Sequence, residues 1–213
     1  MANEMAERLH RYTNLTATIH MLRSRSITLL NPATWDDRND AYFMAECKRK
    51  VDAKTVLALC FAERQESYHH WRVFAHGSDG VRIEFDKEKL LSTFETDDRI
   101  TSDYVMYKKI DEVRKVKFFQ IRQLPFLKRL PYKDEGEYRV VYVDPEETME
   151  SKSFNIKISW IRRITLSPWI AQPLFASVKQ TLQSIDGCSG LKIYRSTLIE
   201  NEKWRSLASD VWE

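Results

Sequence analysis

Hydrophobicity alternates with a period of two in several short stretches of this chain, and that period is typical of strands that bury one face. In the stretch 81–85, the apolar residues Val81, Ile83 and Phe85 alternate with charged residues, so we expect these three to face the core. The stretch 134–143 alternates in the same way. Further strands are predicted at apolar stretches bounded by turn signals: 9–13, 26–30, 55–61, 105–107, 156–160, 161–166 and 191–194.

Apolar residues at helical spacing predict helices between these strands. Leu15, Ile19 and Leu22 share one stripe, and Thr13 or Asn14 precedes them as a possible N-cap. Further helices are predicted near residues 41–54, 87–94, 111–130 and 168–183. Because strands and helices are mixed without an internal repeat or a flexible linker, we predict one α+β domain over residues 1–213.

Composition narrows the class of protein. The 43% of hydrophobic residues and the low Gly and Pro counts (5 and 6) indicate a globular chain. No apolar run approaches 18 residues, and the segment 1–10 lacks the apolar middle of a signal peptide, so we expect a cytoplasmic protein without membrane contact. Cys47, Cys60 and Cys188 are odd in number and scattered, which favours reduced thiols. A net charge of +3 permits an anionic ligand but does not by itself indicate nucleic-acid binding.

Two carboxylates lie close together in the stretch 134–143, which reads D-E-G-E-Y-R-V-V-Y-V. Residues i and i+2 of a strand project to the same side, roughly 7 Å apart at about 3.3 Å per residue. Glu135 and Glu137 can therefore act on one substrate, and Arg139 on the same face can hold either carboxylate ionised. Spacing alone fits equally a solvated strand face that carries a Glu137 to Arg139 ion pair.

Near the N-terminus, Arg11 lies just before a predicted helix start. A guanidinium in that place can hold a phosphate or a ribose, although a surface arginine has the same local pattern. Tyr12 and Thr13 beside it can serve as core and cap only. The loop 33–40, A-T-W-D-D-R-N-D, is dense in charge around Trp35, and surface loops of that kind often carry function.

An aromatic segment in the middle of the chain holds His69, His70 and His76 together with Trp71 and Phe74. No cysteine or acidic residue lies at a recognised metal-ligand spacing from these histidines, so we expect no metal site. Trp71 and Phe74 are three residues apart, which is the spacing of a helix that packs its aromatic face inward. The alternative is that Trp71 walls a pocket for a flat ring.

The stretch 111–130 is basic and aromatic, and it is expected to be helical. A solvated helix face accounts for this pattern, while a nucleic-acid contact is the functional alternative. Its basic residues are Arg114, Lys115, Lys117, Arg122, Lys128 and Arg129.

Four segments, taken in order, resemble those of a large bacterial family of uncharacterised domains. They read L-H-R-Y-T, then I-T-L-L-N-P-A-T-W-D-D-R-N-D, then L-C-F-A-E-R-Q-E-S-Y-H-H-W-R-V-F-A-H-G-S-D-G-V-R-I-E-F-D, then Y-K-D-E-G-E-Y-R-V-V. Members show a basic-Tyr pair, an Asn-Asp loop, a Cys-Phe strand, a Trp-x-x-Tyr helix and a Glu-x-Glu-aromatic-Arg strand. Here Phe74 stands where the family has Tyr, and the loop W-D-D-R-N-D departs from the family's Asn-Asp-Pro.

This layout in turn resembles the ADP-ribosyltransferase-like superfamily. The resemblance implies a core of two packed, mostly antiparallel sheets with flanking helices, and NAD as a substrate without a metal. It also implies that Glu137 is catalytic with Glu135 as its partner, and that Arg11, or His10 beside it, is the early residue that contacts the dinucleotide. The residues it places around the cofactor are Arg11, Tyr12, Thr13, Trp35, Asn39, Trp71, Glu135 and Arg139.

Two hypotheses follow from the resemblance. The first is an ADP-ribosyltransferase, a bacterial toxin or phage-defence effector, that modifies RNA, DNA or a protein and is neutralised by an antitoxin protein in its host. The second is a non-catalytic module of the same fold that binds a nucleotide or a partner protein. A hydrolase that consumes NAD without labelling an acceptor is a third alternative.

Overall fold

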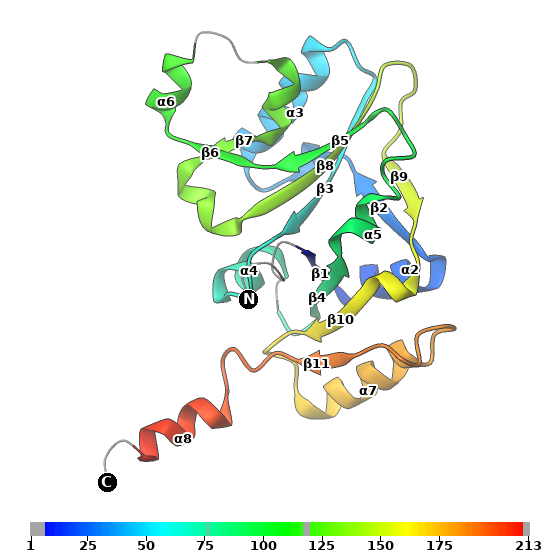
Figure 1. Cartoon of the computed structure of the whole chain (residues 1–213), viewed down its shortest axis with the longest axis vertical. Helices are drawn as coiled ribbons and strands as arrows, with labels where there is room; N and C mark the ends of the chain where they lie inside the picture. Colours follow the sequence, from blue (N-terminus) through cyan, green and yellow to red (C-terminus); the bar gives the residue numbers. More distant parts are fainter. Residues whose placement is uncertain (1–6, 76, 117–119, 211–213) are drawn as a thin grey trace.

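The computed structural model of the chain describes residues 7–75, 77–116 and 120–210 (Figure 1). His76 and Lys117, which belong to the histidine and basic segments above, lie outside the described residues. The strands are β1 Arg8–Asn14, β2 Ser26–Leu30, β3 Thr55–Ala62, β4 Gly80–Asp86, β5 Ile100–Tyr104, β6 Met106–Lys108, β7 Leu127–Arg129, β8 Glu137–Asp144, β9 Ser151–Asn155, β10 Ile161–Leu166 and β11 Ile193–Arg195. The helices are α2 Leu15–Ser24, α3 Arg38–Lys50, α4 Tyr68–Phe74, α5 Lys87–Leu91, α6 Ile110–Lys115, α7 Gln172–Gln183 and α8 Glu202–Asp210, with 3-10 turns η1 Pro32–Thr34, η2 Ile121–Phe126, η3 Leu130–Glu135 and η4 Ile158–Trp160.

Within the described residues, nine strands form one mainly antiparallel sheet. Its path is β11-β10-β4-β1-β3-β2-β9, while β8 pairs with β3 and β5 pairs with β8. Strands β6 and β7 form a separate parallel pair. The sheet and its surrounding helices confirm the α+β class, whereas the extent of a single ADP-ribosyltransferase-like domain over residues 1–213 stays a prediction.

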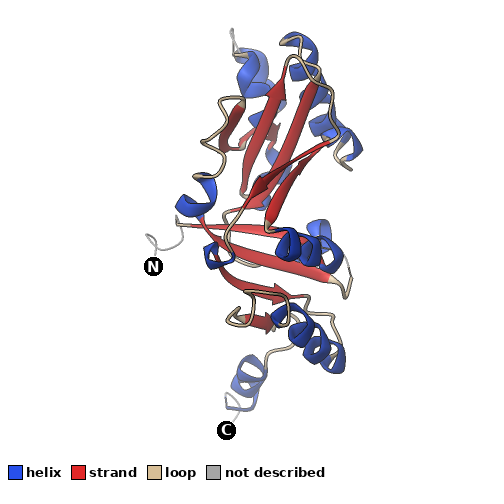
Figure 2. Cartoon of the chain, turned by 90° about the vertical axis from the view of Figure 1, so that its right-hand side faces the viewer, coloured by secondary structure: helices blue, strands red, loops and turns tan. Residues whose placement is uncertain are grey.

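The large sheet is divided near its middle. Strands β1 and β3 share a single residue pair, His10 with Ala62, whereas β1 and β4 pair over seven residues and β3 and β8 over eight. Figure 2 accordingly shows the strands in two groups, one above the other. Since the two groups diverge between β1 and β3, side chains from both can line a space there.

Both faces of β3 and β8 are covered. One face contributes Leu57, Leu59 and Tyr142, among others, to the main apolar core. The opposite face packs Val56, Ala58 and Val141 into a second cluster, together with Met44 of α3 and Phe126 of η2. Because α3 and η2 cover this second face, the polar residues that β8 places on it are removed from water.

The local sequence accounts for several element boundaries. Asn14 caps α2 by accepting a hydrogen bond from Ala17 N, which selects one of the two caps that the sequence offered. Asp37 caps α3 in the same way through Asn39 N and Asp40 N, so α3 begins at Arg38 instead of near Ala41. The strands predicted at 9–13, 26–30, 55–61, 81–85 and 161–166 are confirmed.

The predicted helix over residues 111–130 is wrong for most of its length. The helix α6 covers six residues, and the segment continues through η2 into β7. Pro125 lies within η2, and a proline both removes a backbone donor and disfavours helix in the residue before it. The terminal residues 127–129 instead pair with β6.

Other predicted boundaries also change. The strand predicted at 156–160 is wrong: the strand that pairs with β2 is β9, which ends at Asn155, and η4 follows it. Strand β5 and helix α8 were not predicted, and α8 extends away from the body of the molecule (Figures 1 and 2). None of the described helices has the length and apolarity that a membrane span requires.

Candidate functional site

A cavity of about 530 Å³ lies between the two groups of strands. It receives residues of β1, of β3 and β8, of the loop before α3, of α4 and of the segment that joins β7 to β8. The residues that line it are His10, Arg11, Tyr12, Leu30, Thr34, Trp35, Asp36, Asp37, Asp40, Ala58, Cys60, Phe61, Ala62, Val73, Phe74, Lys128, Tyr132, Glu135, Glu137 and Arg139.

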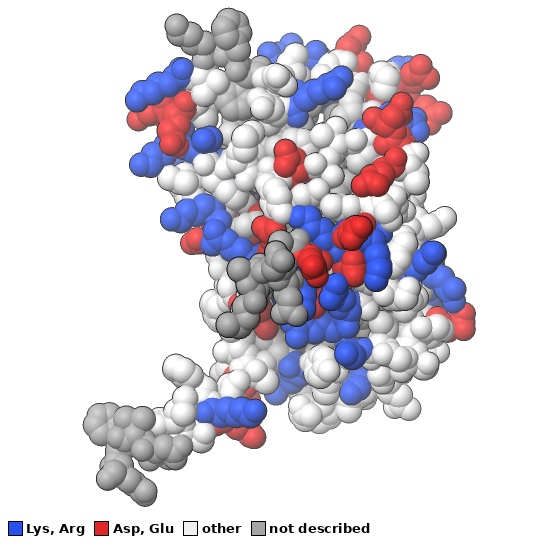
Figure 3. Space-filling model, in the orientation of Figure 1, with Lys and Arg blue, Asp and Glu red and all other residues white. Residues whose placement is uncertain are grey.

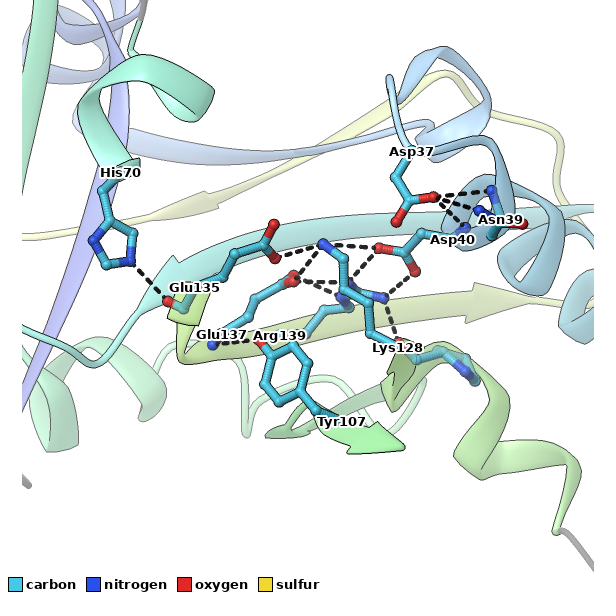
Figure 4. Close-up of polar contacts among 10 residues, drawn as sticks. Asp37, Asn39, Asp40, His70, Tyr107, Lys128, Glu135, Glu137 and Arg139 are labelled. Carbon is cyan, nitrogen blue, oxygen red and sulfur yellow. Dashed lines mark hydrogen bonds and ion pairs between the residues drawn. The ribbon is translucent and has the colours of Figure 1, made fainter. Parts of the chain in front are cut away.

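Arg139 of β8 is the centre of a buried ion-pair network on one wall of this cavity (Figure 4). Its Nε donates a hydrogen bond to Glu137 Oε1 at 2.8 Å, and its Nη2 donates to Glu137 Oε2 at 2.9 Å. On the other side, Nη1 and Nη2 donate to Asp40 Oδ1 at 2.9 Å and Asp40 Oδ2 at 2.7 Å. A fully buried guanidinium thus joins a carboxylate of β8 to a carboxylate of α3.

Lys128 of β7 extends the network toward the cavity. Its Nζ lies 2.6 Å from Glu135 Oε2, 3.5 Å from Glu137 Oε2 and 3.5 Å from Asp40 Oδ2. With Arg139, two cations therefore face three carboxylates, each with no more than 9% of its surface exposed. Buried charges of this kind require mutual pairing, because taking each of them out of water is costly.

The environment separates the pKa values of the two neighbouring glutamates. Burial alone would raise the pKa of Glu137, but the charges of Arg139 and Lys128 outweigh it and lower this pKa to about 2. Burial raises the pKa of Glu135, and the negative charges of Glu137 and Asp40 act in the same direction against the attraction of Lys128. Glu137 is therefore ionised at neutral pH, while Glu135 is the more basic carboxylate.

A left-handed glycine places these two glutamates. Gly136 has φ +52°, and a Cβ atom there would approach the side chain of Arg64 to 2.5 Å, so this turn requires glycine. The turn ends η3 at Glu135 and starts β8 at Glu137, so the expectation that both glutamates lie on one strand is wrong. Both nevertheless face the cavity, because the turn aims Glu135 at the same lysine that contacts Glu137.

His70 and Tyr107 hold the backbone around the turn. The His70 Nε2–H donates to the carbonyl oxygen of Glu135 at 2.9 Å, since a carbonyl can only accept. Ser67 Oγ lies 2.7 Å from His70 Nδ1, and burial lowers the pKa of His70, which suits a neutral ring. On the other side, Glu137 N donates to Tyr107 Oη at 2.9 Å. His70 and Tyr107 are thus positioning residues for the two carboxylates.

Arg11 is the cation that contributes to the cavity from β1. Its Nη1 donates to the carbonyl oxygen of Cys60 at 3.0 Å, and no ion pair is recorded for it with any described carboxylate. Burial lowers the pKa of Arg11. An arginine beside a cavity without a carboxylate partner has hydrogen-bond donors available for an anionic ligand.

Beside Arg11, both ring nitrogens of His10 already have protein partners. Its Nδ1 lies 3.1 Å from the carbonyl oxygen of Ala62, and its Nε2 lies 3.5 Å from Glu84 Oε2. Between the two early basic residues that the sequence offered, Arg11 has the more available donors.

Six of the nine predicted site residues line the cavity: Arg11, Tyr12, Trp35, Glu135, Glu137 and Arg139. The other three do not. Thr13 is half-buried on β1, and Asn39 is exposed in the first turn of α3, where it donates to Asp37. Trp71 is fully buried and donates from its ring nitrogen to Glu66, so it belongs to the core, and Phe74 is the aromatic residue that α4 gives to the cavity.

Five further residues lie at the site without having been predicted there from the sequence: Asp40, Cys60, His70, Tyr107 and Lys128. The signal for Asp40 is the dense charge of the stretch 33–40, and Lys128 is one basic residue of the stretch 111–130, whose pattern predicts a helix. The solvated ion pair expected of Glu137 and Arg139 is present, but it is buried. In the described part of the chain, no group of three or more His, Cys, Asp or Glu side chains is arranged to hold a metal ion.

Comparisons with known proteins give one family and one kind of solved structure. Residues 70–140, from α4 to β8, match the model of a family described as Protein of unknown function (DUF2971). No curated protein matches the chain.

The solved structures that resemble the chain include DarT of Thermus sp. 2.9 in three complexes. With NAD+, the identity is 10%, the TM-score 0.45, and the alignment covers 89% of this chain and 95% of that one. With ADP-ribosylated ssDNA, the values are 12%, 0.45, 89% and 94%, and with carba-NAD+ they are 9%, 0.43, 89% and 95%.

Proposed function

We propose that this protein is an NAD-dependent ADP-ribosyltransferase whose reaction centre is the cavity between β1 and β8. The observation that carries this proposal is the pairing, across one cavity, of an ionised carboxylate with an arginine that lacks a carboxylate partner. NAD matches both, because it combines a negative pyrophosphate with a ribose carbon that gains positive charge when the bond to nicotinamide breaks. The resemblance of the sequence segments to the ADP-ribosyltransferase-like superfamily supports the same assignment.

Glu137 is the proposed catalytic carboxylate. When the bond between ribose C1′ and the nicotinamide nitrogen breaks, its electron pair leaves with nicotinamide, and the ribose becomes an oxocarbenium-like cation. A fixed negative charge beside the ribose stabilises that cation, as in glycoside cleavage. The pKa of Glu137, about 2, keeps this negative charge present throughout the neutral range.

Glu135 is the proposed general base for the acceptor. The acceptor nucleophile, a group on a nucleic-acid base or on a protein side chain, forms the new bond to C1′ and must lose its proton. A carboxylate with a raised pKa takes that proton more readily than one with a pKa near 2. Lys128, which contacts both glutamates, fixes their positions relative to each other.

The remaining lining residues suit the other parts of NAD. Arg11 is proposed to donate to the pyrophosphate, as guanidinium groups do with phosphates. Tyr12, Trp35 and Phe74 offer aromatic surface at the cavity, where a flat nicotinamide or adenine ring can stack. Such an activity would modify nucleic acid or protein of the cell that makes the enzyme. A toxin or phage-defence role with a neutralising antitoxin partner therefore belongs to the same proposal.

The direct test is nicotinamide release. Purified protein incubated with NAD is expected to release nicotinamide and to attach ADP-ribose to one acceptor class among single-stranded DNA, RNA and cell protein, as measured by chromatography and mass spectrometry. Nicotinamide release without any labelled acceptor would indicate a hydrolase. If neither nicotinamide release nor labelling occurs with any acceptor class, the transferase assignment is wrong.

Arg11→Ala should weaken NAD binding more than it slows the reaction. Loss of a charge-assisted hydrogen bond to phosphate costs about 1.5–3 kcal/mol, so the KM for NAD is expected to rise about 10- to 100-fold with little change in kcat. Arg23→Ala, an exposed arginine on α2, is the matched control and should leave both constants unchanged. An unchanged KM in Arg11→Ala would remove Arg11 from the NAD site.

The second candidate function is a non-catalytic module of the same fold that binds a nucleotide or a partner protein. One observation favours it: both carboxylate oxygens of Glu137 already accept hydrogen bonds from Arg139. A carboxylate held in this way has less capacity to accept hydrogen bonds from the ribose hydroxyls of a substrate. Tight NAD binding by calorimetry, with no nicotinamide released, would support this second function over the first.

A further inference from the structure

A second cavity, of about 450 Å³, lies on the other side of the segment that connects β7 to β8. Its lining contains four basic side chains and no acidic one, and the complete set is Lys108, Lys109, Ile110, Arg129, Leu130, Pro131 and Lys133. In Figure 3, Lys and Arg side chains, with some Asp and Glu among them, recur along the edge of the molecule that carries α6 and β6. We call this cavity the basic cavity.

The side chains of the four cations of the basic cavity form no ion pair among the described residues, and the Glu112 carboxylate contacts Lys109 only by accepting a hydrogen bond from its backbone nitrogen at 2.6 Å. Lys108, Lys109, Arg129 and Lys133 are all exposed, and no ion pair with a described acidic residue is recorded for any of them. Arg99, by contrast, pairs with both Asp97 and Asp144. Four basic side chains without ion-pair partners therefore give this cavity a positively charged lining.

Strand pairing increases this concentration of charge. Lys108 and Arg129 are register partners in the parallel pair of β6 and β7, where neighbouring strands are about 4.8 Å apart. Like charges placed side by side in a sheet destabilise it. An anion bound between the two side chains would relieve the repulsion, and a ligand with several negative charges would match all four cations.

The basic cavity and the candidate reaction centre share a wall. On β7, Lys128 lines the reaction centre and its neighbour Arg129 lines the basic cavity. In η3, Tyr132 and Glu135 line the reaction centre, whereas Lys133 lines the basic cavity. The two cavities therefore use neighbouring residues of the same two segments, β7 and η3.

The chemistry favours a nucleic-acid strand as this ligand. A phosphodiester backbone carries one negative charge per nucleotide, so two or more adjacent phosphates satisfy four clustered cations, and Ile110 and Leu130 give apolar contact for a base beside them. We infer that the basic cavity binds the backbone of a single-stranded nucleic acid and that this strand is the acceptor, an inference that rests on the proposed transferase function. An adjacent base would then reach past η3 toward Glu135.

Binding of labelled oligonucleotides tests this inference without NAD. A fluorescent single-stranded 12-mer, as DNA and as RNA of the same sequence, is titrated with wild-type protein and with the double variant Lys108→Ala, Arg129→Ala. Each phosphate contact contributes about −0.7 to the slope of log K against log salt for single strands. Loss of two contacts should therefore reduce the magnitude of this negative slope by about 1.4 and weaken binding roughly 25-fold at 0.1 M salt. Preference for one oligonucleotide identifies the sugar of the acceptor.

The matched control is Lys192→Ala, Lys203→Ala, which removes two exposed lysines at the opposite end of the molecule, next to β11 and in α8 (Figure 1). This variant should bind as wild type does. The inference is wrong if wild type binds neither oligonucleotide, if both double variants lose affinity equally, or if a polyglutamate peptide of the same charge binds as tightly as the oligonucleotides. Oligonucleotide binding that depends on the basic cavity, in a protein that leaves NAD intact, would overturn the acceptor role together with the transferase function.

Discussion

Replacement of Glu137 by Gln is expected to slow nicotinamide release from NAD by roughly 10²- to 10³-fold, which is the effect of removing one preorganised electrostatic contact to a transition state. Gln keeps the size and hydrogen-bonding reach of Glu but lacks the charge that opposes the ribose cation. KM should change little, because ground-state NAD carries no full positive charge on its ribose. Initial rates of nicotinamide release at saturating NAD measure the effect.

Asp144→Asn is the matched control for this substitution. Asp144 ends the same strand, is 1% exposed, and has a pKa lowered to about 2 by hydrogen bonds from Tyr142 and from the backbone, together with the charge of Arg99. It does not line the cavity. If Asp144→Asn reduces the rate as much as Glu137→Gln does, the loss reflects a general weakening of β8 and not the chemistry of one carboxylate.

Replacement of Arg139 by Ala should cost about 3–5 kcal/mol of unfolding free energy, the largest stability effect that we expect from a single substitution here. The change leaves the carboxylates of Asp40 and Glu137 buried without their main partner. Lys128 is 3.5 Å from each and already contacts Glu135, so it cannot replace a bidentate guanidinium. Urea denaturation followed by circular dichroism measures the loss.

Arg49→Ala is the comparison for this effect. Arg49 pairs with Glu46 three residues earlier on α3, but its side chain is 67% exposed, so its removal should cost less than about 0.5 kcal/mol. If Arg139→Ala does not yield folded protein, Asp40→Asn gives a milder version of the same break and should still cost more than Arg49→Ala. Equal stabilities for the buried and exposed variants would show that the network contributes nothing to the fold.

The same buried network thus has two expected effects, on catalysis and on stability. Glu137 is held in place by Arg139, which in turn is held by Asp40 of α3. A substitution in α3 near Asp40 should therefore alter the position of Glu137 through Arg139. This connection explains why the first turn of α3 belongs to the site although Asp40 is 99 residues away from Arg139 in the sequence.

The sequence by itself determined most strands, the first helix with two possible caps, and the residues Arg11, Glu135, Glu137 and Arg139 as candidates. It could do so because a period of two, a helical stripe and an Asn cap are local properties, and because closely spaced charged residues are visible without a structure. The alternation in the stretch 134–143 also predicted which face of β8 carries Glu137 and Arg139. It did not predict that α3 and η2 would cover that face.

Tertiary structure alone decided burial, and burial decided the chemistry. Trp71 and Phe74 are three residues apart on one helix and were expected to share one face. Packing nevertheless places Trp71 in the core and Phe74 at the cavity. In the sequence, Lys128 is one basic residue among many. In the structure, β7 pairs with β6, and Lys128 of β7 contacts two glutamates. Burial raises the pKa of Glu135, whereas the charges of Arg139 and Lys128 lower the pKa of Glu137 against the same burial. Asp40, which completes this buried network, is 99 residues from Arg139, and a contact over that separation leaves no periodic signal in the sequence.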